Sequence, residues 1–303
     1  MAGARRGALD IRGGGTKAFY AEAPSGEPLD LTRLAGISSY EPSELVVTAR
    51  ASTGSLRDFV MGVSLLNGRG EVLCFGGQVM KNVAGYDVSR LLAGSWGVLG
   101  VICEVSLKVV PVARATATLC FDWDEPHALR QLYGWAAQAL PLRASCWQQG
   151  QLRVRLEGSE SAVRAAQRKL GGALLAPDVA APWWDSVRDQ QHEFFRLGDA
   201  DLGSGVCLWR LSVPAVTAPL DLPGRRLIEW GGAQRWWRSA APASQFRAAA
   251  ASAGGHATLV RAADKSPGAF SRPSEALMQI HRRLKQSFDP ERIFNPGRLY
   301  ADL

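Results

Sequence analysis

The most informative stretch of this 303-residue chain is residues 81–102, KNVAGYDVSRLLAGSWGVLGVI. Glycines at positions 94, 97 and 100 remove side chains at intervals of three, at the start of an apolar strand predicted over 99–109. Backbone without side chains can lie close to a flat or charged ligand. The same spacing also suits a helix-to-strand turn packed against its neighbours, so the residues alone leave both interpretations open.

Two further segments invite a ligand-binding interpretation. Arg12-Gly13-Gly14-Gly15-Thr16 follows a strand predicted over 8–11, and consecutive glycines let neighbouring N–H groups turn toward one point, as in a phosphate nest. Near the end, Asn295 precedes a proline, which favours an extended backbone and lets its amide face a ring edge. The alternatives are a plain glycine turn and simple chain termination by two prolines.

The composition is that of a globular protein, with 47% hydrophobic and 21% charged residues, and it excludes disorder, collagen and coiled coil. The 35 basic and 28 acidic residues give a net charge of +7 that is spread mainly over arginines. Such dispersed charge favours acidic small molecules or a negatively charged partner subunit over nucleic acid. Five cysteines without a CxxC pair indicate a reduced cytoplasm and predict neither a disulfide framework nor a zinc or iron–sulfur site.

No transmembrane span or secretory signal is predicted. The most apolar stretch, residues 91–110, contains Glu104, Lys108 and three glycines, and the N-terminal sequence lacks an apolar core. We therefore expect a soluble cytoplasmic protein.

The pattern of apolar residues predicts two domains that meet near Pro111. Before it, short strands are predicted over 8–11, 45–49, 59–66, 71–75 and 99–109, with Asn67-Gly68 supplying the positive φ of a hairpin turn. Beyond it, helical and alternating patterns predict an α+β domain, with strands over 115–121, 152–156, 206–213, 226–230 and 234–238 and helices over 126–140, 161–170 and 245–253. A last helix is expected from a Ser274 N-cap, through Leu277, Ile280, Leu284 and Phe288, to Asp289.

Histidine and tryptophan give weaker signals. The four histidines form no HExxH motif, and no GxSxG elbow occurs. His256 is the one to test as an acid, base or carboxylate binder, although a structural role is the simpler interpretation; His281 is expected to be packed in the core. The tryptophans Trp183-Trp184, Trp230 and Trp236-Trp237 are expected to lie partly in the core and partly at an interface.

Taken together, these residues resemble the FAD-binding subunits of bacterial glycolate oxidases, the E components of D/E/F complexes and members of the vanillyl-alcohol-oxidase, or PCMH-type, FAD proteins. The matching strings run along nearly the whole chain: RGGGTKAF, SSYEPSELVVTARA, GSLRDFVMGV, FGGQVMKNVAGYDVSRLLAGSWGVLGVICEVSLKV, LIEWGGAQRWW, AGGHATL and FNPGRLYADL. The resemblance implies an α+β fold with a truncated PCMH-type FAD-binding domain over 1–111, an α+β cap domain over 112–286, and a segment, 287–303, that returns to the first domain.

The resemblance also implies a binding site for FAD. Residues 12–16 would contact the pyrophosphate, the glycine turn would contact the nucleotide half, and Tyr86 and Asn295 would approach the flavin. The implied cofactor-binding residues are Arg12, Gly13, Gly14, Gly15, Thr16, Tyr86, Gly94, Ser95, Gly97, Leu99, Gly100, Ile102 and Asn295. No catalytic residue and no metal site is assigned.

The activity implied is oxidation of glycolate or another 2-hydroxy acid, with electrons passing through flavin to a D flavoprotein and an F iron–sulfur subunit. The complex would be cytoplasmic or peripheral at the inner membrane through its partners. One departure matters: Ala51 is followed directly by Ser52, where the family has several dozen residues with a helix and a second glycine-rich loop. The alternative function is therefore a cofactor-deficient structural subunit of the same complex.

Overall fold

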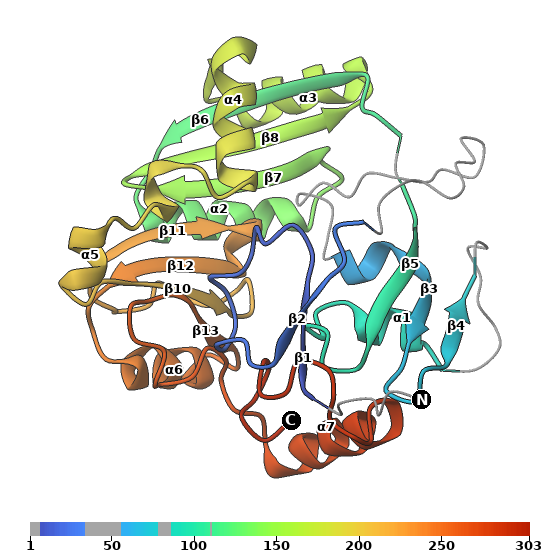
Figure 1. Cartoon of the computed structure of the whole chain (residues 1–303). Coiled ribbons are helices and arrows are strands. Elements are labelled where there is room, and N and C mark those ends of the chain that lie inside the picture. Colours follow the sequence, from blue (N-terminus) through green and yellow to red (C-terminus); the bar gives the residue numbers. More distant parts are fainter. Residues whose placement is uncertain (1–6, 34–55, 78–85, 110) are drawn as a thin grey trace. The chain divides into compact units, whose positions relative to one another are not determined.

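The computed structural model describes residues 7–33, 56–77, 86–109 and 111–303 (Figure 1). The chain divides into two compact units, one formed by Met1–Pro111 with Gly268–Leu303 and the other by Val112–Pro267. This division falls at the boundary predicted near Pro111. The return to the first unit begins at Gly268, earlier than the expected residue 287, because the last helix packs on the first unit. The predicted strand over 45–49 and the Ala51–Ser52 junction lie outside the described residues.

The first unit contains two small sheets. β1 (Leu9–Arg12) pairs in parallel with β2 (Glu27–Asp30), which the sequence analysis did not predict. β3 (Val60–Leu66) is the centre of an antiparallel sheet between β4 (Val72–Gly76) and β5 (Val101–Leu107). A 3-10 turn, η3 (Leu56–Phe59), precedes β3. The core is formed by apolar residues of β3, of α1 (Val88–Leu92) and of the following turn, with side chains of α7 (Glu275–Phe288) packed against it.

The predicted hairpin between β3 and β4 is present, but its turn differs from the prediction. Leu66 pairs with Val72, so residues 67–71 form the connection. The positive φ is at Gly70 and not at Asn67 or Gly68. The buried Asn67 side chain instead accepts hydrogen bonds from Arg69 N (2.9 Å) and Glu71 N (3.0 Å), which closes the longer loop. Gly68 is required by close packing, since a Cβ there would lie 2.8 Å from the Asp289 Cα.

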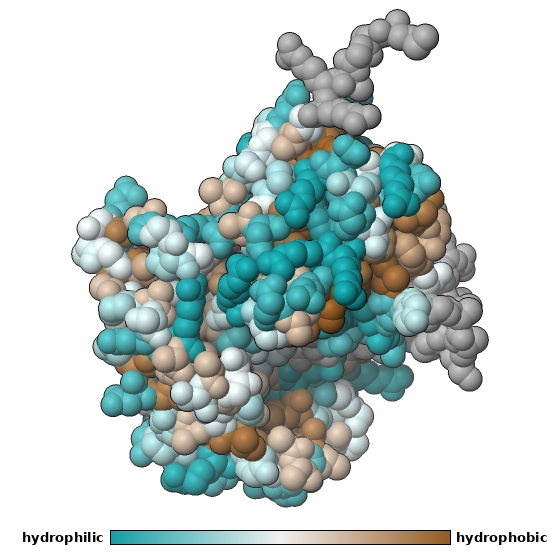
Figure 2. All heavy atoms as spheres, turned by 90° about the horizontal axis from the view of Figure 1, so that it is seen from below, coloured by the Kyte–Doolittle hydropathy of each residue, from teal (hydrophilic) through white to brown (hydrophobic). Residues whose placement is uncertain are grey.

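Helix α7 begins, as predicted, at Ser274, whose side chain accepts a hydrogen bond from Leu277 N. Its buried face is only in part the predicted one: Leu284 and Phe288 pack against the apolar core, as predicted. Leu277 and Ile280, however, are about half exposed (51% and 52%), whereas Met278 and Lys285 are buried. Hydrophilic side chains gather over this helix in the view from below (Figure 2). The helix is therefore rotated so that a charged residue faces the core.

Lys285 is the centre of a buried polar cluster. Its Nζ donates hydrogen bonds of 2.7 Å each to Asp289 Oδ2, Val98 O and Phe294 O. Asp289 also accepts from the backbone N–H groups of Ile293 (3.0 Å) and Phe294 (2.8 Å). A buried ion pair is favourable only when its remaining donors and acceptors are satisfied, and here they are. The cluster joins α7, the C-terminal segment and the glycine turn.

The second unit is built on one antiparallel sheet with the strand order β13-β10-β12-β11-β7-β8-β6-β9 (Figure 1). Its strands are β6 (Ala115–Asp122), β7 (Leu142–Gln148), β8 (Gln151–Gly158), β9 (Ala173–Leu175), β10 (Cys207–Ser212), β11 (Arg225–Glu229), β12 (Gln234–Ser239) and β13 (His256–Arg261). The helices are α2 (Glu125–Ala136), α3 (Glu160–Leu170), α4 (Pro177–Arg188), α5 (Asp199–Gly203) and α6 (Ala243–Ser252), with 3-10 turns η4 (Glu193–Phe195) and η5 (Trp230–Gly232).

Two apolar cores lie against this sheet. One combines Leu152, Val154 and Leu156 of β8 with α2 and α3, and the other packs α6 on β10, β12 and β13. The predicted alternation of β8 is confirmed, because Arg153 and Arg155 point to the opposite face. Strand β7 and helix α4 were not predicted.

The tryptophans predicted for the core are confirmed in part. Trp184, Trp236 and Trp237 are buried, and Trp230 is partly exposed.

Replacement of Lys285 by methionine is expected to destabilise the first unit by about 3–5 kcal/mol, since it leaves the Asp289 carboxylate buried without its cation. The matched control is Lys169→Met on the exposed side of α3, which should change the free energy of unfolding by less than about 0.5 kcal/mol. Chemical denaturation followed by circular dichroism measures both. Equal stability of the two variants would contradict the role given to Lys285.

Candidate functional site

The two glycine-rich stretches lie on either side of the Asn295 side chain. Its Oδ1 accepts a hydrogen bond from Ile11 N (2.7 Å), at the end of β1, and its Nδ2 donates to Trp96 O (2.6 Å), inside the glycine turn. Its backbone N–H donates to Leu9 O (2.8 Å). Asn295 is buried and has a positive φ of 41°. One amide therefore places the start of the 12–16 loop beside the turn at 94–97.

The glycine loop after β1 is open. A Cβ built on Gly13, Gly14 or Gly15 would meet no other atom within 4 Å. Gly15 has a positive φ of 70°, which favours glycine, but Gly13 and Gly14 have no such conformation. Neither packing nor backbone strain within the described residues therefore requires glycine at 13 and 14. The free space is what a ligand lying on the backbone would need.

In the second stretch, the three glycines serve different purposes. Gly100 is required by packing, because a Cβ there would lie 2.5 Å from Leu66 O, and Gly97 is required by the Asn295 amide at 2.7 Å. Gly94 has a positive φ of 88° but faces open space. The packed turn and the ligand-binding backbone, the two interpretations left open by the sequence, therefore each hold in part. Gly97 and Gly100 are needed to pack the turn, whereas Gly94 leaves its backbone accessible.

The other predicted site residues differ in how far they are exposed to solvent. Ser95 and Leu99 are buried, and Leu99 belongs to the apolar core, so only its backbone can face a ligand. Ile102 is 41% exposed on β5. Tyr86 is 93% exposed just before α1, and in the described part of the chain no contact joins it to either glycine stretch. Its predicted place beside the flavin remains a prediction.

Charged groups flank the open loop. The Arg12 Nε donates to the buried Asp10 carboxylate (2.5 Å), which fixes the arginine beside Gly13. Arg298 donates to the carbonyls of Glu22 and Ala18 and lies over the Trp96 ring at 5.9 Å. Burial lowers the pKa of Arg298, and the nearby Asp10 and Glu22 oppose that shift.

The sequence analysis did not single out Trp96 or Arg298 as site residues. Trp96 packs edge-on against Tyr20, with ring centroids 4.8 Å apart, and against Phe270. Both residues lie inside quoted motifs, Trp96 in residues 81–102 and Arg298 in FNPGRLYADL, and this position was the only available signal. The structure was needed to show that the Arg298 guanidinium lies over the Trp96 indole.

The described residues contain no group of His, Cys, Asp and Glu side chains that could hold a metal ion. Over the same residues, no helix is long and apolar enough to span a membrane.

His281 is partly buried and contacts the Tyr300 ring, with centroids 5.7 Å apart. His256 starts β13 opposite Ser212, and it is an exposed residue. Its partial burial, followed by the nearby Arg210, lowers its pKa.

Comparison with solved structures identifies the fold class. The chain is similar to p-cresol methylhydroxylase, with a TM-score of 0.61 and 12% identity over 97% of this chain and 84% of that one. It is equally similar to 4-ethylphenol oxidase from Gulosibacter chungangensis, with a TM-score of 0.61 and 13% identity over 97% of this chain and 85% of that one. The predicted α+β fold of the PCMH-type FAD oxidases is confirmed.

Sequence relatives specify the family within this class. Residues 264–299 match the family "FAD linked oxidases, C-terminal domain". The glycolate oxidase subunit GlcE of Escherichia coli (strain K12) is 39% identical over 340 aligned positions, which cover 97% of this chain and 93% of the relative. The chain belongs to this GlcE family of glycolate oxidase subunits. A more distant similarity, 41% identity over 26% of this chain, links it to 17% of the glycolate oxidase subunit GlcD of Bacillus subtilis (strain 168).

The alignment with the Escherichia coli relative bears on the short connection after Ala51. Its 340 positions exceed the 303 residues of the chain by 37, so at least that many residues of the relative have no counterpart here. This excess agrees with a missing internal segment. The position of the gap stays a prediction, since residues 34–55 are outside the described part.

Replacement of Asn295 by alanine is expected to separate the two glycine stretches. The variant leaves Ile11 N and Trp96 O without their buried partner, which costs about 1–3 kcal/mol of unfolding free energy. Hydrogen exchange should then show faster exchange at Ile11, and thermal unfolding should show the loss. Unchanged exchange at Ile11 would contradict the bridging role.

His256 predicts a pH dependence of stability. The pKa of His256 is lower in the folded chain than in the unfolded chain, where it is about 6.5. As the pH falls through this value, the unfolded chain takes up a proton at His256 before the folded chain does. The free energy of unfolding therefore decreases toward acid pH. His256→Gln should remove part of this decrease between about pH 7.5 and 5.5, measured by denaturant titration. An identical pH slope in the variant would contradict the shift.

Proposed function

We propose that the chain is the FAD-binding subunit of a complex that oxidises glycolate, or a similar 2-hydroxy acid, to the 2-oxo acid. The observation that carries the proposal is the pair of open glycines, Gly13 and Gly14, beside Arg12 and next to the glycine turn. Membership of the GlcE family supports the complex and its substrate. The similarity to a GlcD subunit supports a related flavoprotein partner.

The residues fit the nucleotide part of FAD. Backbone N–H groups of residues 13–16 would bind the pyrophosphate, as glycine-rich nests bind anions, and Arg12 would offset its charge. The accessible backbone at Gly94 and the half-exposed Ile102 would contact the nucleotide from the second stretch. Asn295 would act by positioning, because both ends of its amide already bond to the backbone. When bound, FAD supplies the two-electron acceptor chemistry.

In this proposal, the chain itself contributes binding and positioning. The buried Asp10 holds Arg12 at the loop, and the aromatic packing of Trp96 and Tyr20 fixes the turn on its other side. The predicted D flavoprotein and F iron–sulfur subunits would take the electrons onward, in a complex that is cytoplasmic or peripheral at the inner membrane through them.

A second candidate function is a cofactor-deficient structural subunit of the same complex. The observation that favours it is the alignment excess of at least 37 residues in the Escherichia coli relative. If the missing segment formed one wall of the FAD site, its loss would remove hydrogen-bond donors and lower FAD affinity. The subunit would then act through its surfaces alone.

The flavin content of the purified chain, alone and with its partner subunits, separates the two functions. The proposal expects an absorbance spectrum of bound flavin, with FAD in a one-to-one ratio after desalting, and bleaching on addition of glycolate to the assembled complex. Colourless protein that still assembles with its partners would instead support the structural subunit. Bleaching only by another 2-hydroxy acid would correct the substrate.

Replacement of Gly14 by valine is expected to lower FAD affinity at least tenfold while leaving the apoprotein as stable as the wild type, because the new side chain occupies ligand space and not protein space. Gly134→Val on α2 is the matched control, since Gly134 also faces open space but lies in the other unit, and FAD content should stay unchanged. FAD titration followed by flavin fluorescence measures both. Equal affinities would refute the loop as the binding element.

A further inference from the structure

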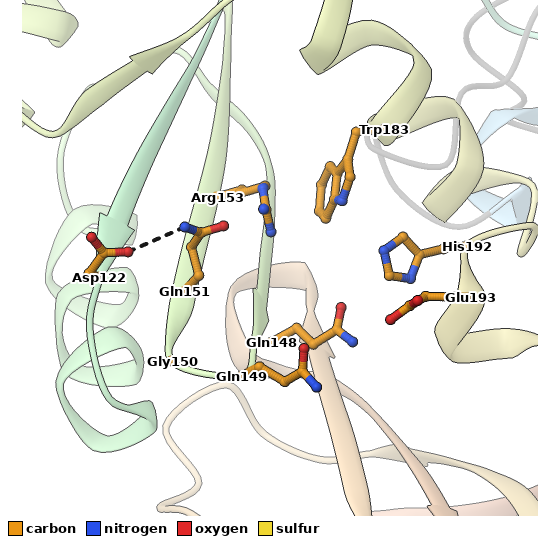
Figure 3. A pocket seen from close by; sticks show the side chains of 9 residues that line it. All are labelled: Asp122, Gln148, Gln149, Gly150, Gln151, Arg153, Trp183, His192 and Glu193. Atoms are coloured by element: carbon orange, nitrogen blue, oxygen red, sulfur yellow. Dashed lines mark hydrogen bonds between the residues drawn. The ribbon is translucent and has the colours of Figure 1, made fainter.

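A polar pocket of about 290 Å³ lies within the second unit, and the function proposed above makes no use of it (Figure 3). It is formed at the turn between β7 and β8 and by the segment after α4. The residues that line it are Asp122, Gln148, Gln149, Gly150, Gln151, Arg153, Trp183, His192 and Glu193. The side chains of Arg153, Trp183, His192, Glu193 and Gln148 surround one common space in Figure 3.

Arg153 supplies the positive charge of this pocket. It lies on β8, on the face opposite the apolar core, because Leu152 and Val154 on either side point inward. Its Nε is buried, and this atom has no hydrogen-bond acceptor in the described part of the chain. The thiol of Cys120, the residue paired with it on β6, is a neighbour of the guanidinium but only a weak acceptor. No carboxylate among the described residues forms an ion pair with Arg153, in contrast to Arg155, whose guanidinium lies 2.7 Å from Glu157. A buried guanidinium N–H without an acceptor favours an anion.

The indole of Trp183 holds this guanidinium in place. The Arg153 Cζ lies 4.5 Å from the centroid of the Trp183 ring, which is within the range of a cation–π contact. The contact uses the π face of the Trp183 indole and occupies none of the hydrogen-bond acceptors that the guanidinium N–H groups could use. A planar guanidinium edge matches the two oxygens of a carboxylate.

The two acidic residues of the pocket have other partners. Asp122 accepts a hydrogen bond from Gln151 Nε2 (3.2 Å) and lies beyond it as seen from Arg153 (Figure 3). The Glu193 carboxylate lies 3.5 Å from the guanidinium of Arg225, a residue that does not line the pocket. Neither carboxylate therefore neutralises Arg153, although Glu193 lowers the positive potential of the pocket.

His192 adds a second donor. Its Nδ1 accepts a hydrogen bond from Phe194 N (3.2 Å), which places the proton of the neutral ring on Nε2. Burial lowers the pKa of His192, Glu193 opposes this shift, and nearby arginines add to it. The ring is therefore neutral at pH 7, and Nε2–H can donate. The ring also packs edge-on against Trp183, with centroids 5.8 Å apart.

The turn beside the pocket is a two-residue hairpin in which both central residues have positive φ, Gln149 at 50° and Gly150 at 79°. Asn or Asp usually occupies the first of these positions, and a glutamine there is strained. Gln148 and Gln149 both line the pocket, Gln148 as a buried residue, and their amides add donors.

We propose that this pocket binds a small carboxylate anion, with Arg153 as its bidentate partner and the amides and imidazole as further donors. All the residues that line the site belong to the second unit. The ligand would be a small organic acid, since the volume of about 290 Å³ lies near the lower end of the range for ligand pockets.

The test is calorimetric titration of the full chain with sodium glycolate and sodium acetate, and with inorganic phosphate as a tetrahedral comparison. The expected result is saturable binding of the carboxylates, reduced at least tenfold by Arg153→Gln and retained by Arg164→Gln. Arg164 is the matched control, because it is an exposed arginine of the same unit whose partner is Glu160. Glu193→Gln should tighten binding, since it removes the opposing charge.

The proposal would be overturned by the absence of saturable carboxylate binding in the wild type, or by equal binding in Arg153→Gln. Tighter binding of phosphate than of either carboxylate would also reject it. If Arg153→Gln fails to fold, Arg153→Lys serves in its place, because it keeps the charge but loses the planar edge, and its affinity should still fall. Binding that is lost in Gly14→Val but kept in Arg153→Gln would assign the ligand to the FAD site instead.

Discussion

The buried ion pair of Lys285 and Asp289 is the interaction on which the first unit depends. It lies where three separate parts of the chain meet: the C-terminal turn of α7, the backbone at Phe294 and the glycine turn at Val98. A lysine can remain charged at such a position only if every N–H finds an acceptor. That requirement fixes the C-terminal segment against the turn and so places Asn295 within reach of Ile11 and Trp96.

The glycines of the two stretches therefore have different roles. Gly97 and Gly100 allow the turn to lie against Asn295 and Leu66, and they are needed for packing. Gly13, Gly14 and Gly94 face free space and keep the backbone accessible from outside. A packed turn and a ligand-binding loop are therefore parts of one structure, and the packed half holds the accessible half in position.

In the second unit, strand β8 contributes to the apolar core with one face and to the polar pocket with the other. Alternation along β8 sends Leu152, Val154 and Leu156 into the core and leaves Arg153 and Arg155 on the other face. Arg155 is neutralised by Glu157, whereas Arg153 rests on Trp183 and faces a polar pocket. The difference depends on α4 and the turn that follows it, which bring Trp183 and His192 to this face.

Hydrophobic period and glycine placement are local signals, and they were enough to predict the division near Pro111, most strands and long helices, the α+β class and the two glycine-rich stretches. The same signals misplaced Leu277 and Ile280 of α7 and the positive φ of the β3–β4 turn, and they missed β7 and α4. They gave no sign that Lys285 is buried, because two of its three acceptors lie on other segments. The packing of the folded chain was needed to see which glycine is packed, that Asn295 bridges two distant segments, and that Arg153 lacks an acidic partner, since each depends on residues far apart in the chain.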